Sequence, residues 1–463
     1  MKKAIHNPER LKFGALCACL LFCLGFVLSI PAPGLASQTA SETQPLRVYL
    51  PILTRPPGYV ESTGILDPSF DGDGRVITDL TQTGDEGLSL ALQPDRKLLV
   101  GGEVDSGLMY EIDLAVARYN RDGSLDTTFG DGGWVRTDLD GYDDAASDLA
   151  LQSDGKILQS GSSRGDFALV RYNPDGSLDP TFGGGVGWVR TDIGSFADES
   201  KAIAVQSDGK ILVGGYALNG SYYDFALVRY HADGSLDTGF GGDGIVTTYL
   251  TPDNDQGQAL VLLADGRIIL AGSVQRASPF FHDFALVCYL PDGTLDPSFG
   301  SNGRVITDIN GGRDFAYAVT LQADGKILVA GRAQDGPTGD IDFALVRYSA
   351  IGGLDTTFSG DGKVTTDFTG GEDRAYAITV QPDGKVIIAG YAFMGSGFDF
   401  ALARYLPNGS LDPIFGTGGK LVTDFMAGDD LGLAVVLQLD GKIVVAGNAF
   451  NGIDADFALA RYK

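Results

Sequence analysis

The sequence predicts an all-β fold, a seven-bladed β-propeller with four antiparallel strands in each blade. An LDxxF element recurs seven times at intervals of 53 to 59 residues, each copy holds four strand-like runs, and no stretch keeps a helical period. Short strands repeated in sets of four are typical of propellers, whose blades surround a central channel. The element begins at Leu66, Leu125, Leu178, Leu236, Leu295, Leu354 and Leu411.

Each copy is expected to form four strands, which we name a, b, c and d in chain order. In one copy they are "AIAVQ" (202–206), "KILVGG" (210–215), "DFALVRY" (224–230) and "IVTTYL" (245–250). The Asp-Gly turn between strands a and b is a strong hairpin signal. Apolar residues on both faces of "DFALVRY" suit a strand that packs between neighbouring blades.

The order of the strands predicts how the ring closes. The repeats begin on a d strand, "RVITDL" at 75–80, and end on a c strand, "DFALARY" at 456–462. An unpaired d strand and an unpaired abc set complete one blade and remove two exposed sheet edges. We therefore expect residues 75–80 to pair with the last blade.

The first 36 residues have the pattern of a secretory signal peptide. Four basic residues precede an uncharged apolar run at 13–30, and "GLA" ends at Ala36. The run has 18 residues, so an uncleaved membrane anchor is the alternative. This pattern predicts a chain that is secreted, extracellular or attached to the cell surface. Residues 37–63 are expected to be a linker and residues 64–463 the propeller.

The charge and cysteine content exclude some classes of function. Without residues 1–36 the chain has 30 basic and 59 acidic residues, a net charge of −29. Nucleic acid is an unfavourable partner for such a surface, because its affinity for proteins comes largely from Lys and Arg. Only Cys288 remains outside the first 36 residues, which excludes an intramolecular disulfide in the exported part.

The repeat "LDxxFGxxGxVxTD…AxAxQxDGKIxVxG…DFALxRYxxDGxLD" resembles the bacterial delta-60 repeat family, and more distantly the WD-repeat propellers. The resemblance covers all seven copies. It implies a propeller architecture and no particular reaction.

The Arg of "DFALVRY" is expected to be structural. It recurs in six copies, with Cys288 at the same position of the remaining copy. In each copy it precedes the turn that leads to the "LD" acid, for example Arg171 before Asp179, so we expect the two to form an ion pair. Six similar sites are a poor design for one catalytic centre.

Two rings of aspartates are expected on the face formed by the d-to-a and b-to-c connections. They allow two interpretations: the acids accept backbone N–H groups at the strand starts, or they hold calcium, a hard cation that takes carboxylate oxygens. No other cofactor is expected. The ring considered for calcium is Asp85, Asp144, Asp198, Asp255, Asp314, Asp373 and Asp430. The second ring is Asp113, Asp166, Asp224, Asp283, Asp342, Asp399 and Asp456.

The b-to-c connections vary from copy to copy and carry aromatic residues, as a recognition surface would. The candidate binding residues are Tyr110, Tyr222, Tyr223, Phe280, Phe281 and Phe398. These features favour a non-enzymatic binding or scaffold module for a protein or carbohydrate ligand. The alternative is a propeller hydrolase or lyase with calcium in the central channel, for which the sequence shows no cluster of singular polar residues. His231 and His282 are expected on opposite faces.

Overall fold

The computed structural model describes residues 58–107, 112–194, 197–276, 281–337, 339–426 and 428–463. The predicted signal peptide and most of the predicted linker lie outside these ranges. The described residues form 28 strands and one short 3-10 helix, Gly183–Gly185. No helix in this part of the chain is long and apolar enough to cross a membrane.

The strands form seven four-stranded antiparallel sheets, each of which is one blade. Blade 1 contains β2 (Asp85–Leu92), β3 (Leu98–Asp105), β4 (Ile112–Tyr119) and β5 (Trp134–Thr137). Blade 2 contains β6 (Asp144–Leu151), β7 (Ile157–Ser163), β8 (Asp166–Tyr172) and β9 (Trp188–Thr191). Blade 3 contains β10 (Glu199–Val205), β11 (Ile211–Asn219), β12 (Tyr222–Tyr230) and β13 (Ile245–Thr248). Blade 4 contains β14 (Asp255–Leu262), β15 (Ile268–Gln275), β16 (His282–Tyr289) and β17 (Arg304–Thr307). Blade 5 contains β18 (Phe315–Leu321), β19 (Ile327–Gln334), β20 (Ile341–Tyr348) and β21 (Lys363–Thr366). Blade 6 contains β22 (Asp373–Val380), β23 (Val386–Phe393), β24 (Phe398–Tyr405) and β25 (Lys420–Thr423). Blade 7 contains β26 (Asp430–Leu437), β27 (Ile443–Phe450), β28 (Ala455–Tyr462) and β1 (Arg75–Thr78).

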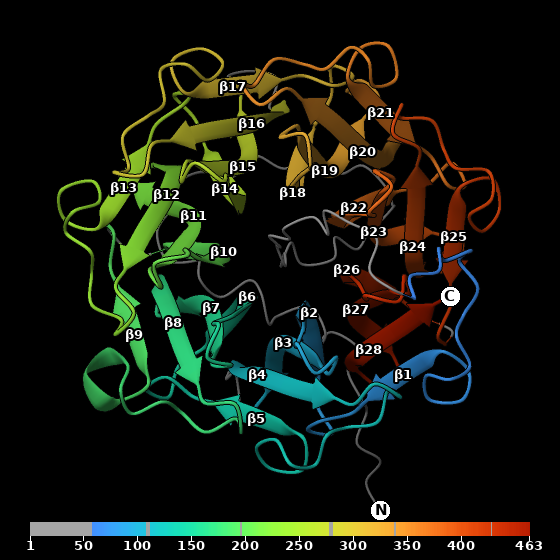
Figure 1. Ribbon diagram of the computed structural model, residues 1–463, viewed down its shortest axis with the longest axis horizontal. Helices are drawn as coiled ribbons and strands as arrows, with labels where there is room; N and C mark the ends of the chain where they lie inside the picture. Colours follow the sequence, from blue (N-terminus) through green and yellow to red (C-terminus); the bar gives the residue numbers. More distant parts are fainter. Residues whose placement is uncertain (1–57, 108–111, 195–196, 277–280, 338, 427) are drawn as a thin grey trace, which may run out of the picture. The chain divides into compact units, whose positions relative to one another are not determined.

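The predicted seven-bladed propeller is confirmed, and so is its closure. The blades follow one another around a ring (Figure 1), and blade 7 has the order β1-β28-β27-β26. Arg75 pairs with Ala460 and Thr78 with Phe457. Strand β1 ends at Thr78, two residues earlier than expected, because the chain turns there: the Asp79 side chain accepts the Gln82 N–H at 2.7 Å.

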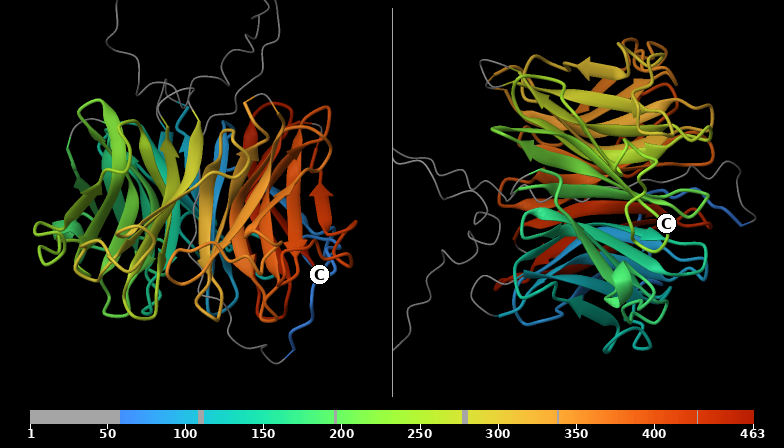
Figure 2. Two further views of the ribbon diagram at one scale, coloured as in Figure 1. Left: turned by 90° about the horizontal axis from the view of Figure 1, so that it is seen from above. Right: turned by 90° about the vertical axis from the view of Figure 1, so that its left-hand side faces the viewer.

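The antiparallel order fixes which connections share a face. The a-to-b and c-to-d connections lie at one end of every blade, and we call this end the turn face. The b-to-c and d-to-a connections lie at the other end, and we call this the loop face. Figure 2 shows the blades from the side, with the connections gathered at the two ends.

Adjacent blades are joined by a tyrosine and a threonine that recur at all seven junctions. The c-strand tyrosine is buried, and its hydroxyl hydrogen-bonds to a threonine in the d strand of the preceding blade at 2.7 to 3.0 Å. The pairs are Tyr119–Thr78, Tyr172–Thr137, Tyr230–Thr191, Tyr289–Thr248, Tyr348–Thr307, Tyr405–Thr366 and Tyr462–Thr423. Each hydroxyl is thereby satisfied inside an apolar core, where an unpaired one would be costly.

The end of the predicted linker takes part in closing the ring. Between blades 1 and 2, Arg118 Nη1 donates to Pro174 O in the next blade's turn, and Gly130 N donates to Asp175 O. Between blades 6 and 7, Arg404 Nη1 donates to Ser62 O and Gly416 N donates to Thr63 O. Residues 62–63 therefore take the place of the c-to-d turn in blade 7, whose d strand is β1.

Candidate functional site

The expected Arg–Asp pairs are present and belong to the framework. Arg171 Nε lies 2.6 Å from Asp179 Oδ2, and Lys156 Nζ lies 2.7 Å from the same oxygen. The guanidinium stacks 4.5 Å from the Phe182 ring centroid and donates to Ala232 O of the next blade. Although burial opposes it, hydrogen bonds from Lys156 and Thr181 together with the Arg171 charge hold the pKa of Asp179 well below its usual range.

The same pair recurs wherever the repeat supplies the arginine. In blade 4, Arg267, which directly precedes strand β15, donates to Asp296 at 2.9 Å, beside the buried Cys288. Because they recur around the ring, these pairs stabilise the framework and do not mark one functional site. The other pairs are Arg118–Asp126, Arg229–Asp237, Arg347–Asp355, Arg404–Asp412 and Arg461–Asp67.

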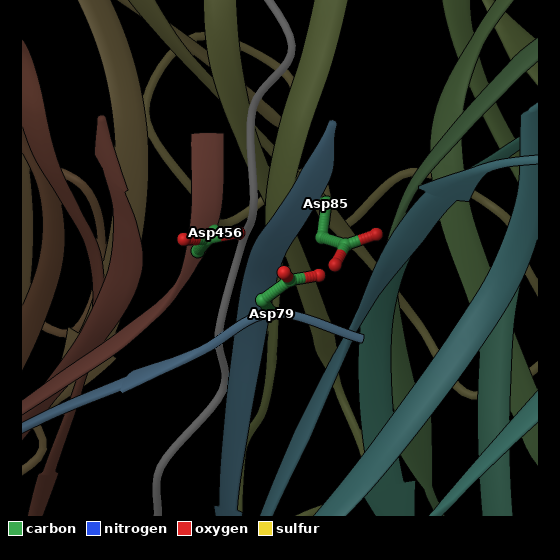
Figure 3. Close-up of side chains that lie close together, drawn as sticks. All are labelled: Asp79, Asp85 and Asp456. Atoms are coloured by element: carbon green, nitrogen blue, oxygen red, sulfur yellow. The ribbon is translucent and has the colours of Figure 1, made fainter. Parts of the chain in front are cut away.

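The aspartates of the loop face form triads at the junctions between blades. Each triad combines the aspartate at the start of a c strand, the aspartate directly after the d strand of the same blade, and the first aspartate of the next a strand. Asp456, Asp79 and Asp85 form one of them (Figure 3). In at least five such sets, one carboxylate oxygen of each residue lies within 4.8 Å of the others. Besides Asp456–Asp79–Asp85, they include Asp113–Asp138–Asp144, Asp166–Asp192–Asp198, Asp283–Asp308–Asp314 and Asp342–Asp367–Asp373.

One oxygen of each a-strand aspartate holds the preceding loop. Asp85 Oδ2 accepts the N–H groups of Leu80 at 2.6 Å and Thr81 at 3.2 Å. The other six aspartates of this ring each accept one or two backbone N–H groups in the same way. The interpretation that these aspartates accept backbone N–H groups is therefore confirmed for one oxygen of each residue.

The triads are electrostatically unfavourable when all three carboxylates are charged. Two carboxylates 4.8 Å apart repel by about 3.5 kcal/mol at an effective dielectric near 20. Burial, with a smaller contribution from the neighbouring aspartates, raises the pKa of Asp85 to about 6 and those of Asp144 and Asp373 to about 7. These sites can relieve the repulsion by taking up protons or a cation.

The aspartate that follows the d strand was not among the residues predicted for the site from the sequence. The sequence contains its signal, because an Asp follows the threonine that ends the d strand in six of the seven blades. In blade 3 this position is Tyr249, so that junction keeps only Asp224 and Asp255. One junction of the ring thus differs from the others.

A second set of residues distinguishes the blades from one another at the inner end of the loop face. Near the start of each a strand, one residue lies opposite a residue near the end of the b strand, and no two blades share the same pair. We call these the rim pairs. They are Glu86–Glu103, Ala145–Ser162, Glu199–Tyr216, Gln256–Ser273, Phe315–Arg332, Arg374–Tyr391 and Leu431–Asn448. The sequence alone shows no cluster of singular polar residues, but strand register places polar rim residues side by side within blade 3 and across the neighbouring blades 5 and 6.

The rim pairs form two polar groups. In blade 3, Lys201 Nζ lies 2.8 Å from Glu199 Oε2, which also accepts the Tyr216 hydroxyl at 2.6 Å. Across blades 5 and 6, Arg332 and Arg374 both face Glu372.

The blade 5 and 6 group continues as a row of aromatic rings. Tyr317 stacks on Tyr376 at 4.7 Å, and the hydroxyls of Tyr376 and Tyr391 lie 3.1 Å apart. His282 stacks on Phe315 at 4.4 Å and so joins this row. His231 Nε2 lies 3.7 Å from Asp237 Oδ1 in a c-to-d turn, on the opposite face as expected.

The surroundings of Glu103 favour the protonated form of its carboxyl group. It is buried, and its Oε2 accepts the Ala146 N–H of the next blade at 3.0 Å. Burial and the nearby Glu86 charge raise its pKa to about 8. A neutral carboxylic acid can donate a proton or a hydrogen bond.

Two of the aromatic residues predicted for binding lie outside the described residues, namely Tyr110 and Phe280. Tyr222 and Tyr223 open strand β12, since only two residues separate it from β11. Tyr222 is 47% exposed, whereas Tyr223 is half-buried and meets Tyr216 edge-on at 5.0 Å. Phe281 is half-buried beside β16. Phe398 opens β24 and packs against Tyr391 at 5.0 Å, so packing is part of its role.

Exposed aromatic side chains gather on the loop face. Among the described residues, the aromatic side chains that stand out as large exposed groups are Tyr142, Tyr222, Tyr249 and Phe393. All four lie in d-to-a connections or at the ends of b and c strands. Arg164 of a neighbouring hairpin covers the Tyr142 ring at 3.7 Å. The exposed apolar residues of the turn face are aliphatic, for example Ile351 and Leu354.

A hollow on the turn face recurs at two junctions between blades. A volume of about 480 Å³ between blades 5 and 6 is bordered by Asp324, Lys326 and Arg347. A second hollow of about 290 Å³, between blades 7 and 1, has the corresponding Asp440, Lys442 and Arg461 at its border. Both follow from the framework ion pairs.

Comparison with solved structures finds similarity to several proteins at low sequence identity. Virginiamycin B lyase from Staphylococcus aureus is 11% identical with a TM-score of 0.49, and the match covers 83% of this chain and 98% of the lyase. An ulvan lyase bound to an oligosaccharide is 12% identical with a TM-score of 0.46, over 88% and 95% of the two chains. A gluconolactonase from Xanthomonas campestris is 12% identical with a TM-score of 0.39, over 88% and 94%.

No curated protein matches the sequence. A family profile described as a domain of unknown function (DUF5122) β-propeller matches it in seven segments, one for each repeat. The segments are residues 93–129, 152–182, 206–240, 263–299, 322–358, 381–415 and 438–463. The first six run from the a-to-b turn to the end of an LDxxF element, the seventh ends at Lys463, and together they cover half of the chain. The chain therefore belongs to the DUF5122 β-propeller family.

Proposed function

We propose that this protein is a secreted or cell-surface β-propeller that acts as a non-enzymatic binding or scaffold module, with the loop face as its working surface. The observation that carries the proposal is the gathering of exposed aromatic side chains on this face. Exposed aromatic rings bury much area at a small entropy cost and stack on sugar rings or on partner side chains. The ligand is a carbohydrate or a protein.

The strongest part of this surface is the junction between blades 3 and 4. Tyr222 and Tyr249 are 47% and 57% exposed there, and Tyr249 occupies a position that is aspartate in the other six blades. The Tyr223 backbone N–H donates to Asn254 Oδ1 at 3.2 Å, which ties the start of β12 to the neighbouring connection. Two exposed rings on a well-hydrogen-bonded support form a pre-organised contact surface.

The test is binding of the full chain to a panel of soluble neutral and uronic-acid-containing polysaccharides, and to surface proteins of the producing cell. We expect Tyr222→Ala and Tyr249→Ala each to weaken binding about tenfold or more, as loss of an aromatic anchor does. Ile351→Ala, an equally exposed apolar change on the turn face, is the matched control. Equal affinities for all three variants and the wild type would exclude the loop face as the working surface.

The second candidate is a hydrolase or lyase with calcium in the central channel, and the rim pairs favour it. Glu103 supplies an acid with a pKa of about 8, the kind of group that serves as a general acid near neutral pH. Cleavage of a panel polysaccharide that is lost in Glu103→Gln would support this candidate and contradict the non-enzymatic proposal.

The location has its own test. The basic start and apolar run of residues 1–36 support export. N-terminal sequencing of protein from the culture medium and from the membrane fraction distinguishes cleavage after Ala36 from an uncleaved anchor.

A further inference from the structure

The triad of Asp79, Asp85 and Asp456 brings together residues from both ends of the propeller. Asp79 follows β1, Asp85 is the first residue of β2, and Asp456 lies at the start of β28 (Figure 3). These three segments meet where the ring closes. A ligand held by all three carboxylates would fasten the closing blade to blade 1.

One oxygen of this triad lacks a partner although it is buried. Asp456 is 2% exposed, its Oδ2 accepts Asn451 Nδ2 at 2.8 Å, and its Oδ1 has no hydrogen-bond partner. Both oxygens of Asp85 accept hydrogen bonds from the loop, so its carboxylate is held in place. A buried carboxylate oxygen without a partner is unfavourable unless a cation or a proton satisfies it.

At some junctions between blades, an arginine side chain neutralises the aspartate at the start of the c strand, and at others it does not. Arg136 pairs with Asp113, Arg190 lies 3.3 Å from Asp166, and Arg276 pairs with Asp283. Within the described residues, no Lys or Arg forms an ion pair with Asp79, Asp85 or Asp456. The nearby acids Asp454 and Asp79 instead add negative charge around Asp456.

The triad in blades 5 and 6 shares this lack of compensation. Asp342 Oδ1 and Asp373 Oδ1 are buried oxygens without a hydrogen-bond partner, and Asp373 is fully buried. Asp335 and Asp340 add two further negative charges near Asp342.

We propose that a divalent cation of the calcium class binds at the triads that no arginine neutralises, and above all at Asp79–Asp85–Asp456, where it joins the last blade to the first. Calcium takes six to eight oxygen ligands in a flexible geometry, so carboxylates from three separate segments suit it, with water and backbone carbonyls completing the shell. Magnesium requires a near-ideal octahedron and binds more weakly at such a site. The inference concerns the framework and is independent of the ligand of the loop face.

The test is isothermal titration calorimetry of the full chain, stripped of metal, with calcium chloride. We expect Asp79→Asn to remove one calcium site, because the triad loses one of its three carboxylates. The fold should be kept, since Asp79 is exposed and Asn preserves an oxygen for the Gln82 N–H. The matched control is Asp224→Asn at the blade 3 to blade 4 junction, where Tyr249 replaces the third aspartate of the triad; it should leave the number of sites unchanged. Asp456→Asn provides a second variant of the same site, with circular dichroism to verify its fold.

Thermal melts provide a second readout. Calcium should raise the Tm of the wild type, with reversal by chelator, and should raise that of Asp79→Asn less. Sodium chloride at equal ionic strength should not reproduce the effect. Absence of calcium binding at millimolar concentration would overturn the proposal, and so would an equal loss of sites in Asp79→Asn and Asp224→Asn.

Discussion

Arg461 Nε, in the last strand, lies 2.9 Å from Asp67 Oδ2, which precedes the first strand by 8 residues. The two residues are 394 positions apart in the chain. Both are buried, and the Arg461 guanidinium stacks on Phe70 at 4.5 Å. In the other blades, the same Arg–Asp pair forms between residues close together in sequence. At the ring closure it joins the two ends of the propeller and therefore opposes their separation.

We predict that Arg461→Met lowers the free energy of unfolding by about 3 to 5 kcal/mol, because it leaves the buried Asp67 carboxylate with a weaker set of partners. Urea denaturation followed by circular dichroism measures the change. The matched control is Arg75→Met, whose ion pair with Asp73 is 34% and 53% exposed. It should cost less than about 1 kcal/mol. Similar losses in both variants would contradict the closure role of Arg461.

The tyrosine–threonine contacts predict a smaller and uniform effect. In Tyr462→Phe, the Thr423 hydroxyl loses its partner at 2.9 Å while the ring packing is kept. We expect a loss of about 0.5 to 1.5 kcal/mol in the free energy of unfolding, the usual net value of one hydrogen bond. Tyr230→Phe at an internal junction should cost the same, and a much larger loss at Tyr462 would mean that the closure is especially sensitive to this bond.

Cys288 provides a probe of opening of blade 4. Burial raises the pKa of its thiol to about 12, and the side chain is fully buried. In a chain with Cys17, Cys19 and Cys23 changed to serine, we expect no reaction with a thiol reagent until the blade unfolds. The measurement is labelling against urea concentration, and rapid labelling of the native protein would contradict the burial of this residue.

The repeat made the fold predictable from sequence, because seven copies of one motif average out the ambiguity of any single strand. The closure by residues 75–78 followed from counting strands, and the Arg171–Asp179 pair from its place beside a turn. These features depend on local order along the chain. They require no knowledge of which blades face each other.

The candidate site was less predictable because it depends on register between strands. The pairing of Phe315 with Arg332 and of Arg374 with Tyr391 follows from the bulge that shifts each a strand by one residue. Sequence spacing alone does not reveal that bulge. The third acid of each triad, such as Asp79, was visible in the repeat but gained meaning only once blade packing placed it beside Asp85.

Glu103 predicts a pH dependence of stability that runs opposite to that of the framework aspartates. Its pKa is raised from an ordinary value of 4.5 to about 8. The folded state therefore binds a proton more tightly than the unfolded state does. By linkage, the stabilising contribution is complete below pH 4.5 and is lost as the pH rises through 8.

Glu103→Gln should remove this dependence, since an amide keeps an oxygen for the Ala146 N–H at 3.0 Å and has no proton to lose. We expect the variant to be more stable than the wild type at pH 9 by a few kcal/mol and similar to it at pH 5. The measurement is Tm from pH 5 to 9. Glu199→Gln is the control, because its partner Lys201 lies 2.8 Å away, lowers its pKa and keeps it ionised throughout this range. Parallel Tm curves for Glu103→Gln and the wild type would show that Glu103 is already charged in the folded protein at pH 7.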